Sequence, residues 1–400
     1  MAQSPKRSEQ FPPNEISIAH CTQRCVRRAF LTGKDSVSGK NYEYRREWIR
    51  RRLELLAATF GIDVLNYSVM SNHVHTILRT RPDVVKAWDD EEVARRWLQL
   101  FPGERLEDFL GTPTQQDIAQ AIADAKQLTE WRTRLSNISW FMRAFAEPIA
   151  RHANREDECT GRFWEGRFKA QKIVDEAGLL ACAMYVDLNP VRAALAKSPE
   201  QSRFTSAFDR IQARKGRRAT PASKQFWEDF LNEEQVASKL DEAIAANRQV
   251  EVGEQKRQLA SLRSSKKGKN RQLQMEVGAW MAPLQIDERG KPGPQASKSG
   301  VRASDKGFLN MTTDEYLTLL DWTGRYKQEG KRGSIPENLA PIFERLGIEG
   351  SMWCDLVWEY SKYFGHSRAA GHPTSLKKEA QNNKLAWIRG QSSSAICFLS

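Results

Sequence analysis

Two runs of β-forming residues, Ile62 to Met70 and His73 to Leu78, are separated only by the polar pair Ser71-Asn72. A turn this short joins neighbouring antiparallel strands, because parallel strands need a long crossover. Another strand pattern precedes them at 15–23, and helical spacing of apolar residues follows it at 44–60. The strand–helix–strand–strand order predicts an α+β domain built on an antiparallel sheet.

The rest of the chain divides by composition. Residues 1–14 are polar with paired prolines, and we expect them to be disordered. The α+β domain should cover 15–205, with a polar helical insertion at 82–130. A charged helical and linker region is expected at 206–306, and a mainly helical C-terminal module of unassigned role at 307–400. The Gly-, Pro-, Ser- and Lys-rich stretch 286–305 is the expected linker.

Three further elements are expected after the insertion. Apolar residues from Leu135 to Ile149 recur at helical spacing and predict a long helix. The short aromatic and basic run Gly161–Phe168 is typical of a strand or hairpin. A second helix is expected over 175–189, ended by Pro190, with a further helix beginning at Val191.

The charge balance points to an acidic partner. The chain has 400 residues and a formal net charge of +12, and nucleic acid is the first partner to consider. Six cysteines without a Cys-x-x-Cys spacing exclude a disulfide scaffold and a zinc ribbon. The longest apolar run, Ala177 to Val186, is too short to cross a bilayer. We therefore expect a soluble protein with no membrane partner in a reducing compartment, the cytoplasm.

Two histidines at strand spacing form the first candidate site. Side chains two residues apart in a strand point to the same face, so His73 and His75 can reach one metal ion while Val74 packs on the other face. Imidazole pairs suit Zn, Mn, Co or Ni, and added oxygen ligands would allow Mg or Mn. The alternative is two surface or hydrogen-bonded histidines on an amphipathic strand.

Tyr185 and Asn189 form the second candidate, because residues four apart share one face of a helix. A phenol is a weak nucleophile at neutral pH, and a metal that polarises a phosphate could compensate for this. The structural alternative makes Tyr185 a core residue and Asn189 the N-cap of the next helix, with Pro190 at its first position.

The third candidate is the run from Gly161 to Lys169, in which arginines alternate with aromatic residues. This pattern could supply phosphate contacts and flat faces for unpaired bases. It fits equally well an edge strand whose arginines extend over buried aromatics.

Together these segments resemble the HUH single-tyrosine transposases, in particular the REP-associated tyrosine transposases. Ser71-Asn72-His73-Val74-His75 is similar to the family's His-hydrophobic-His motif, and Gly166-Arg167-Phe168-Lys169 to its Trp-x-x-Arg-Phe/Tyr strand. The run Tyr185-Val186-Asp187-Leu188-Asn189-Pro190-Val191-Arg192-Ala193 resembles Tyr-Ile-x-Leu-Asn-Pro-Val-Arg-Ala, and Thr22-Gln23-Arg24 resembles the first strand.

The resemblance implies a ferredoxin-like HUH domain that cleaves and rejoins single-stranded or hairpin DNA through a 5′-phosphotyrosine. Tyr185 would be the nucleophile, and His73, His75 and Asn189 would hold a divalent metal, Mg²⁺ or Mn²⁺. The candidate DNA contacts are Arg162, Arg167, Lys169 and Arg192. Such an enzyme would act in the bacterial cytoplasm or nucleoid, as a monomer or a homodimer.

Two departures from the family pattern stand out. Tyr185 follows His75 by 110 residues, a longer gap than in compact members, which agrees with the insertion at 82–130. The resemblance also ends near residue 210, so it covers about half of the chain. Two other functions stay open: a domesticated DNA-binding protein that recognises hairpin repeats without cutting them, and a metallohydrolase unrelated to DNA. The second leaves the positive charge without a purpose.

Overall fold

The structure is a computed structural model of the chain. It describes residues 7–26, 31–33, 39, 41–101, 113–219, 249–269, 275–287, 293–325, 340–346, 348, 350–365 and 367–398.

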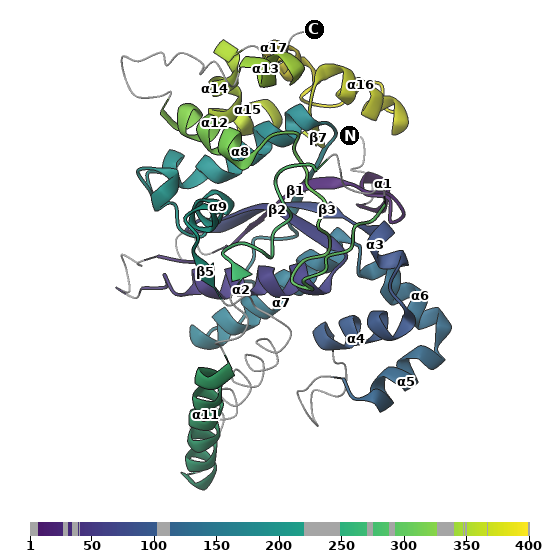
Figure 1. Cartoon of the computed structure of the whole chain (residues 1–400), viewed down its shortest axis with the longest axis vertical. Coiled ribbons are helices and arrows are strands. Elements are labelled where there is room, and N and C mark those ends of the chain that lie inside the picture. The colour runs from purple at the N-terminus through teal and green to yellow at the C-terminus, as the bar shows by residue number, and fades with distance from the viewer. Residues whose placement is uncertain are drawn as a thin grey trace.

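A five-stranded sheet in the order β2-β3-β1-β4-β7 forms the centre of the fold (Figure 1). Its strands are β1 (Ile18–Arg24), β2 (Ile62–Val69), β3 (His73–Thr80), β4 (Lys169–Ile173) and β7 (Ala369–Ala370). The first four pair antiparallel, and the two-residue β7 pairs parallel to β4. The predicted turn joins β2 to β3, with the Met70 amide donating to the carbonyl of His73 at 2.9 Å.

The chain order of this sheet is the ferredoxin-like one. Strands and helices follow as β1, α2 (Arg45–Thr59), β2, β3, α7 (Ile138–Glu156) and β4, which is the β-α-β-β-α-β motif. The predicted α+β class, antiparallel sheet and helical C-terminal region are confirmed. Pro148 lies inside α7 without ending it.

The two faces of the sheet bury two different cores. Val64 and Leu78 pack with α2 and α7 on one face, whereas their neighbours Leu65 and Ile77 pack on the other against α8 (Glu176–Arg192). Figure 1 shows α2 and α7 below the sheet and α8 above it. This division follows from the period of two along each strand.

The insertion is helical, as the sequence predicts. Its described residues form α3 (Pro82–Lys86), α4 (Asp90–Leu100), α5 (Gln115–Ala123) and α6 (Ala125–Arg134). Side-chain caps begin three of these helices: Asp89, Thr114 and Asp124 each accept a hydrogen bond from a backbone amide in the first turn. The helices form a lobe beside the sheet (Figure 1).

Three local predictions differ from the structure. Helix α8 continues through Pro190 to Arg192, because its buried apolar face holds it in place although proline removes one helical hydrogen bond. Residues 161–168 form no strand, since three of their aromatic side chains are buried and leave only a single bridge from Trp164 to Cys25. Residues 7–14 are not disordered: α1 (Arg7–Gln10) donates from Arg7 to the carbonyl of Phe168 at 2.9 Å.

The remaining elements between the sheet and the C-terminal helices are short, apart from α11. They are the 3-10 turn η2 (Pro199–Gln201), α9 (Ser206–Arg214), β5 (Arg218–Ala219), α11 (Gln249–Lys269) and β6 (Met275–Glu276). Residues 256–271 contain lysines and arginines but no acidic residue, and they lie in α11 up to Lys269; the last two are outside the described part of the chain.

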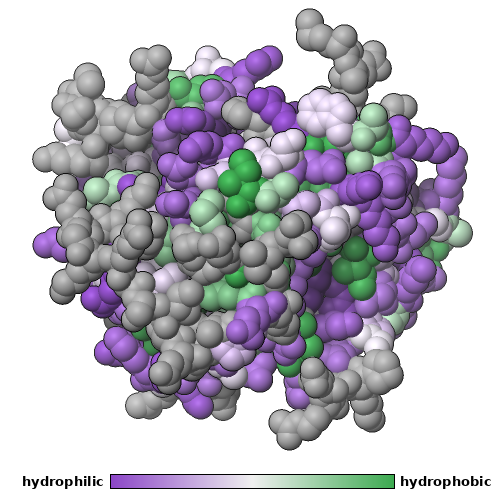
Figure 2. Space-filling model, turned by 90° about the horizontal axis from the view of Figure 1, so that it is seen from above, coloured by the Kyte–Doolittle hydropathy of each residue, from purple (hydrophilic) through white to green (hydrophobic). Residues whose placement is uncertain are grey.

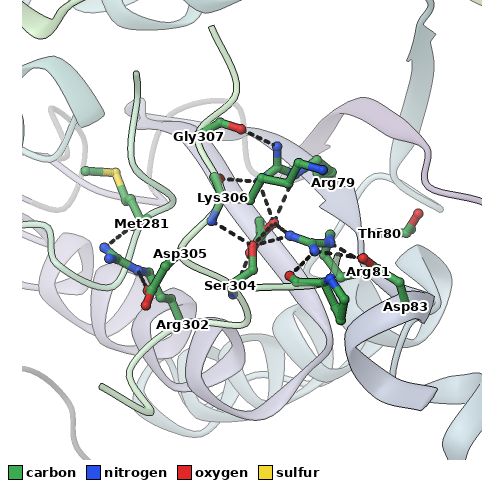
Figure 3. Close-up of polar contacts among 12 residues, drawn as sticks. Arg79, Thr80, Arg81, Asp83, Met281, Arg302, Ser304, Asp305, Lys306 and Gly307 are labelled. Atoms are coloured by element: carbon green, nitrogen blue, oxygen red, sulfur yellow. Dashed lines mark hydrogen bonds and ion pairs between the residues drawn. The ribbon is translucent and has the colours of Figure 1, made fainter. Parts of the chain in front are cut away.

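Residues 293–305 do not form the expected linker, because they dock on the sheet. The buried carboxylate of Asp63 on β2 accepts from Arg79 at 2.8 Å and from the backbone amide of Ser304 at 3.0 Å. Figure 3 shows the side chains of Arg79, Arg81 and Ser304 lying close together. Arg81 donates to Asp63 at 3.3 Å and also to Ser304 and to the carbonyl of Pro294. The two arginines and the serine neutralise and solvate a carboxylate that has no access to water.

The C-terminal helices pack onto α8 rather than forming a separate body. Their apolar residues, among them Tyr316, Trp353 and Tyr360, share one core cluster with the buried face of α8. The helices are α12 (Thr313–Arg325), α13 (Ala340–Leu346), α14 (Gly350–Trp358), α15 (Tyr360–Phe364), α16 (Pro373–Asn382) and α17 (Gln391–Cys397). The basic residues Lys331 and Arg332 lie outside the described residues.

The surface over these helices is mainly hydrophilic, with small separate hydrophobic spots among the polar residues (Figure 2). Among the helices that the structure describes, none combines the length and the apolar character that a bilayer crossing requires.

We expect Asp63→Ala to lower the free energy of unfolding by about 3–5 kcal/mol, because it leaves the buried guanidinium of Arg79 without its counter-charge and removes one of the two carboxylates that pair with Arg81. Urea denaturation followed by circular dichroism measures this loss. The control is Asp314→Ala, which removes an exposed ion pair with Arg214 and should cost at most about 1 kcal/mol. Equal losses for both variants would contradict the role of Asp63.

Candidate active site

A groove of about 1070 Å³ opens along the ends of the central strands. Its walls come from helix α1, the strands β1, β3 and β4, residues 165–168 before β4, helix α8, and the C-terminal α15 with the segment that follows it. The side chains relevant to chemistry are His20, Thr22, His73, His75, Gln171, Tyr185, Tyr360 and Ser361. Residues more than 300 positions apart therefore meet in one groove.

The two predicted histidines line the groove together. Strand β3 places their rings on the same face, with centroids 4.7 Å apart, and sends Val74 into the core under α2 and α7. His75 is 4% exposed and His73 is partly exposed. Burial, aided by the charge of Arg24, lowers the pKa of His73 to about 4. Burial also holds the pKa of His75 well below its usual value, so both imidazoles are neutral at pH 7.

Each imidazole keeps one nitrogen available for a ligand. His73 Nδ1 lies 2.6 Å from the amide oxygen of Asn72, which can only accept, so His73 Nδ1 carries the proton and Nε2 the lone pair. His75 Nδ1 lies 2.9 Å from His20 Nε2, and His75 Nε2 is buried without a hydrogen-bond partner. Two neighbouring imidazoles, each with a ring nitrogen that carries a free lone pair, form the arrangement in which histidines ligate a metal.

Further ligands at this site would have to be oxygen or amide groups. Across the ranges that the structure describes, no three His, Cys, Asp or Glu side chains lie together as a metal site. The histidine pair fits a divalent cation whose other positions are taken by oxygen ligands, the preference of Mg²⁺ and Mn²⁺.

Tyr185 reaches the groove from α8. Its ring centroid lies 5.5 Å from that of His75 and 5.9 Å from that of His20. Tyr360 stacks on it at 4.8 Å, and the hydroxyl of Ser361 lies 3.0 Å from the Tyr185 hydroxyl. The two residues from α15 thus hold the phenol at the histidine pair.

The other candidate residues lie at different places. Asn189, one helical turn after Tyr185, is buried with its amide nitrogen unpaired, but it does not line the groove. Arg192 sits over the Tyr185 ring at 5.0 Å. Arg167 and Lys169 line the groove and are exposed, whereas Arg162 is exposed outside it.

The groove is strongly basic. Its lining holds five arginine and lysine residues and one acidic residue, Glu165; the cations are Arg7, Arg24, Arg167, Lys169 and Arg368. Arg24 lies on β1, Lys169 on β4 and Arg167 just before β4, whereas Arg7 belongs to α1 and Arg368 precedes β7. Such a charge distribution attracts a phosphate backbone.

The aromatic residues of the 161–169 run do not serve as stacking faces. Phe163 and Phe168 are 2% and 8% exposed, and Trp164 donates from its indole to the carbonyl of Ala146 at 2.8 Å. The burial of these rings argues against base stacking on them, and the edge strand of the other interpretation is absent from the described residues 161–168 as well.

A buried carboxylate two residues after Tyr185 anchors α8. Asp187 accepts from Asn66 of β2 at 2.9 Å, from the Ala207 amide of α9 at 3.0 Å and from the Tyr316 hydroxyl of α12 at 2.6 Å. Ser206 also donates to it. Burial raises the pKa of Asp187, although these donors and the charge of Arg210 act in the opposite direction.

Four groove residues were not among the candidates from the sequence: His20, Gln171, Tyr360 and Ser361. His20 carried a signal, since it lies in a predicted strand and is one of only six histidines. The other three carried none, because the two from α15 come from beyond the recognised motifs and Gln171 has no distinctive spacing.

Neither a protein-family model nor a curated protein sequence matches the chain. One solved structure is similar: a REP-associated tyrosine transposase bound to a REP hairpin, at 12% sequence identity. The match covers 49% of this chain and 79% of the other, with a TM-score of 0.28. A likeness at this score does not by itself identify the function.

We expect Asp187→Asn to lower the free energy of unfolding by about 1–3 kcal/mol, because an amide nitrogen would then face hydrogen-bond donors and leave one of them unpaired. Urea denaturation measures the change. Asp321→Asn serves as the control, since its carboxylate forms an exposed pair with Arg325 four residues on. An Asp187→Asn protein as stable as the control would show that the carboxylate does not anchor α8.

Proposed function

We propose that this protein is a metal-dependent transposase or strand transferase that cleaves and rejoins single-stranded or hairpin DNA. The observation that carries the proposal is the convergence of Tyr185, His73 and His75 in one basic groove. A tyrosine beside two neutral imidazoles supplies a nucleophile and a metal site, and the surrounding cations supply affinity for phosphates.

The cations favour nucleic acid over a small metabolite as the substrate. They come from α1, β1, the segment before β4, β4 and the segment after α15 rather than from one element, which suits a chain of phosphates. A single strand or the open end of a hairpin exposes its backbone for entry into such a groove. Of the four DNA contacts expected from the sequence, Arg167 and Lys169 are the proposed phosphate contacts, and Arg24 is a further one.

In the proposed reaction the Tyr185 hydroxyl oxygen attacks a backbone phosphorus. A bond forms between the tyrosine oxygen and phosphorus, and the bond from phosphorus to the 3′-oxygen breaks. The phenol loses its proton, and the departing 3′-oxygen gains one, so that the products are a 5′-phosphotyrosine and a free 3′-hydroxyl. The phosphodiester energy is kept in the new linkage, and attack by a 3′-hydroxyl reverses the step.

The chain's own residues orient the nucleophile. Tyr360 stacks on the Tyr185 ring, Ser361 holds its hydroxyl, and Arg192 covers the ring from another side. Positioning of this kind lowers the entropic part of the barrier. His73 and His75, which line the groove, would hold Mg²⁺ or Mn²⁺. The family resemblance implies Asn189 as a third ligand, but its side chain does not line the groove in this structure. The bound ion would supply charge stabilisation at the phosphate.

A second function also has support in the geometry. Tyr185 is only 7% exposed and its hydroxyl is engaged by Ser361, so the resting groove presents little of the phenol to a substrate. A domesticated protein that binds hairpin repeats in the same groove without cutting them would have the same cations. In either case the partner is DNA, and we place the protein in the bacterial cytoplasm or nucleoid.

Incubation with a labelled hairpin oligonucleotide and Mg²⁺ or Mn²⁺ should give a covalent protein–DNA adduct on a denaturing gel. We expect Tyr185→Phe to abolish this adduct, because the attacking oxygen is removed, while DNA binding persists. Tyr44→Phe is the matched control, since it removes an exposed tyrosine hydroxyl elsewhere.

An adduct that survives in Tyr185→Phe would refute the assigned nucleophile. Tight hairpin binding by the wild type without any adduct, unchanged by His73→Ala, would favour the non-catalytic DNA-binding function instead.

Affinity for the hairpin should fall by orders of magnitude between about 50 and 200 mM salt, because bound phosphates release counterions. The double variant Arg167→Ala with Lys169→Ala should reduce the slope of log affinity against log salt by about one for each phosphate that is no longer neutralised. Fluorescence anisotropy measures both. Arg214→Ala, exposed outside the groove, should leave the slope unchanged; a flat salt response of the wild type would contradict the basic groove as the binding face.

A further inference from the structure

Helix α1 covers part of the outer edge of β4. On its inner side β4 pairs with β1 along its whole length, but on its outer side it pairs with the short β7 only at its last two residues. The carbonyls of Phe168 and Ala170 come before β7 and need other donors. Arg7 donates to both, at 2.9 and 3.3 Å, and Gln10 donates to that of Ala170 at 3.3 Å. The N-terminal helix thus takes the place of a strand beside the first half of β4.

Gln10 also joins α1 to the C-terminal region. Its amide nitrogen donates to the carbonyl of Arg368 at 3.1 Å, and the backbone amide of Lys172 donates to the same carbonyl at 2.8 Å. These bonds use the backbone of Arg368 and not its guanidinium. Arg7 and Arg368 both line the groove, so the two ends of the chain place two cations at the outer edge of β4.

The contacts of Arg7 hold its guanidinium in place without cancelling its charge. Besides the two carbonyls, its partners are the side-chain amide oxygen of Gln10 at 2.8 Å and the ring of Phe168, whose centroid is 4.9 Å away. All of these groups are neutral. A cation that is already held at the groove loses less conformational freedom when it binds a phosphate than a mobile side chain does.

These two cations lie at a distance from the histidine pair. His73 and His75 are on β3, and the sheet order places β1 and then β4 between β3 and the edge that α1 covers. Neighbouring strands are about 4.8 Å apart, so this edge lies about 10–15 Å from β3. Since a stacked strand of DNA carries one phosphate for about 3.4 Å of its length, the separation corresponds to about three or four nucleotides.

We propose that Arg7 and Arg368 form a flank subsite, which binds phosphates of the single strand about three or four nucleotides from the cleaved bond. The inference rests on the proposed function for the cleavage at Tyr185. Arg7 and Arg368 bind DNA in it and take no part in the chemistry. The flank subsite gives a role in substrate binding to two regions that the family resemblance does not cover, one before Thr22 and the other after about residue 210.

The subsite can be tested by the dependence of DNA affinity on the length of a single-stranded flank. Full-length Tyr185→Phe protein, which should not cleave, is titrated by fluorescence anisotropy with hairpins whose flank grows one nucleotide at a time, at the 5′ end in one series and at the 3′ end in the other. We expect affinity to rise and level off in one series only. No rise in either series, or an equal rise when the added flank is double-stranded, would overturn the subsite.

Arg368→Ala removes a cation of the subsite but keeps the carbonyl that Gln10 and Lys172 bind, so its fold should be retained. It should lose most of the affinity gained with the longer flank. For that flank it should also reduce the slope of log affinity against log salt by about 0.7, the value for one phosphate of a single strand. Arg7→Gln, which removes the charge but keeps an N–H donor for β4, should have the same effect.

The matched control is Lys362→Ala, which removes an exposed cation of the C-terminal region that pairs with Glu359 outside the groove. It should keep both the gain and the slope. Folded Arg368→Ala and Arg7→Gln proteins with the gain of the control would refute the subsite. If the gain depends on Arg7 and Arg368 but the wild type forms no covalent adduct, the proposed catalysis fails while the subsite stands. An adduct without any gain from the flank gives the reverse result.

Discussion

The site depends most on the hydrogen bonds that the buried carboxylate of Asp187 accepts. It ties α8 at once to β2, α9 and α12, three elements that are far apart in the sequence. A buried charge is costly unless several donors surround it, so each of these elements must be in place before the helix is held at low energy. Tyr185 lies two residues earlier on the same helix, and its distance from the histidines on β3 is therefore set by the same carboxylate.

The buried ion cluster around Asp63 also joins parts of the chain that are far apart in the sequence. It holds residues 293–307 against β2 and β3, where composition alone indicates a flexible linker. In addition to the contacts of Asp187 and Asp63, the C-terminal helices share one apolar core with α8, and α15 lies at the groove. The C-terminal half is thus a wall of the site: it supplies Tyr360 and Ser361 beside Tyr185, and the carbonyls that orient Gln171.

Local patterns predicted much of the first half of the chain. The two-residue turn between β2 and β3, the alternation that places His73 and His75 on one face, and the helical insertion all depend on interactions within a few residues. The failures have long-range causes. Pro190 does not end α8 because the burial of the helix outweighs the missing hydrogen bond, and residues 161–168 form no strand because their aromatics are taken up by the core.

The sequence by itself determined the α+β class, the spacing of the histidine pair and the placement of Tyr185 and Asn189 on one helical face, because strand and helix periods are properties of the backbone. Only the tertiary structure decided what surrounds them. His20 reaches His75 because β1 pairs with β3, and the cations of Arg7 and Arg368 join those of the strands because both ends of the chain pack at β4. Those contacts join residues hundreds of positions apart, and no local pattern records them. The excess positive charge was visible in composition, but its concentration in the groove of Tyr185 is a result of folding.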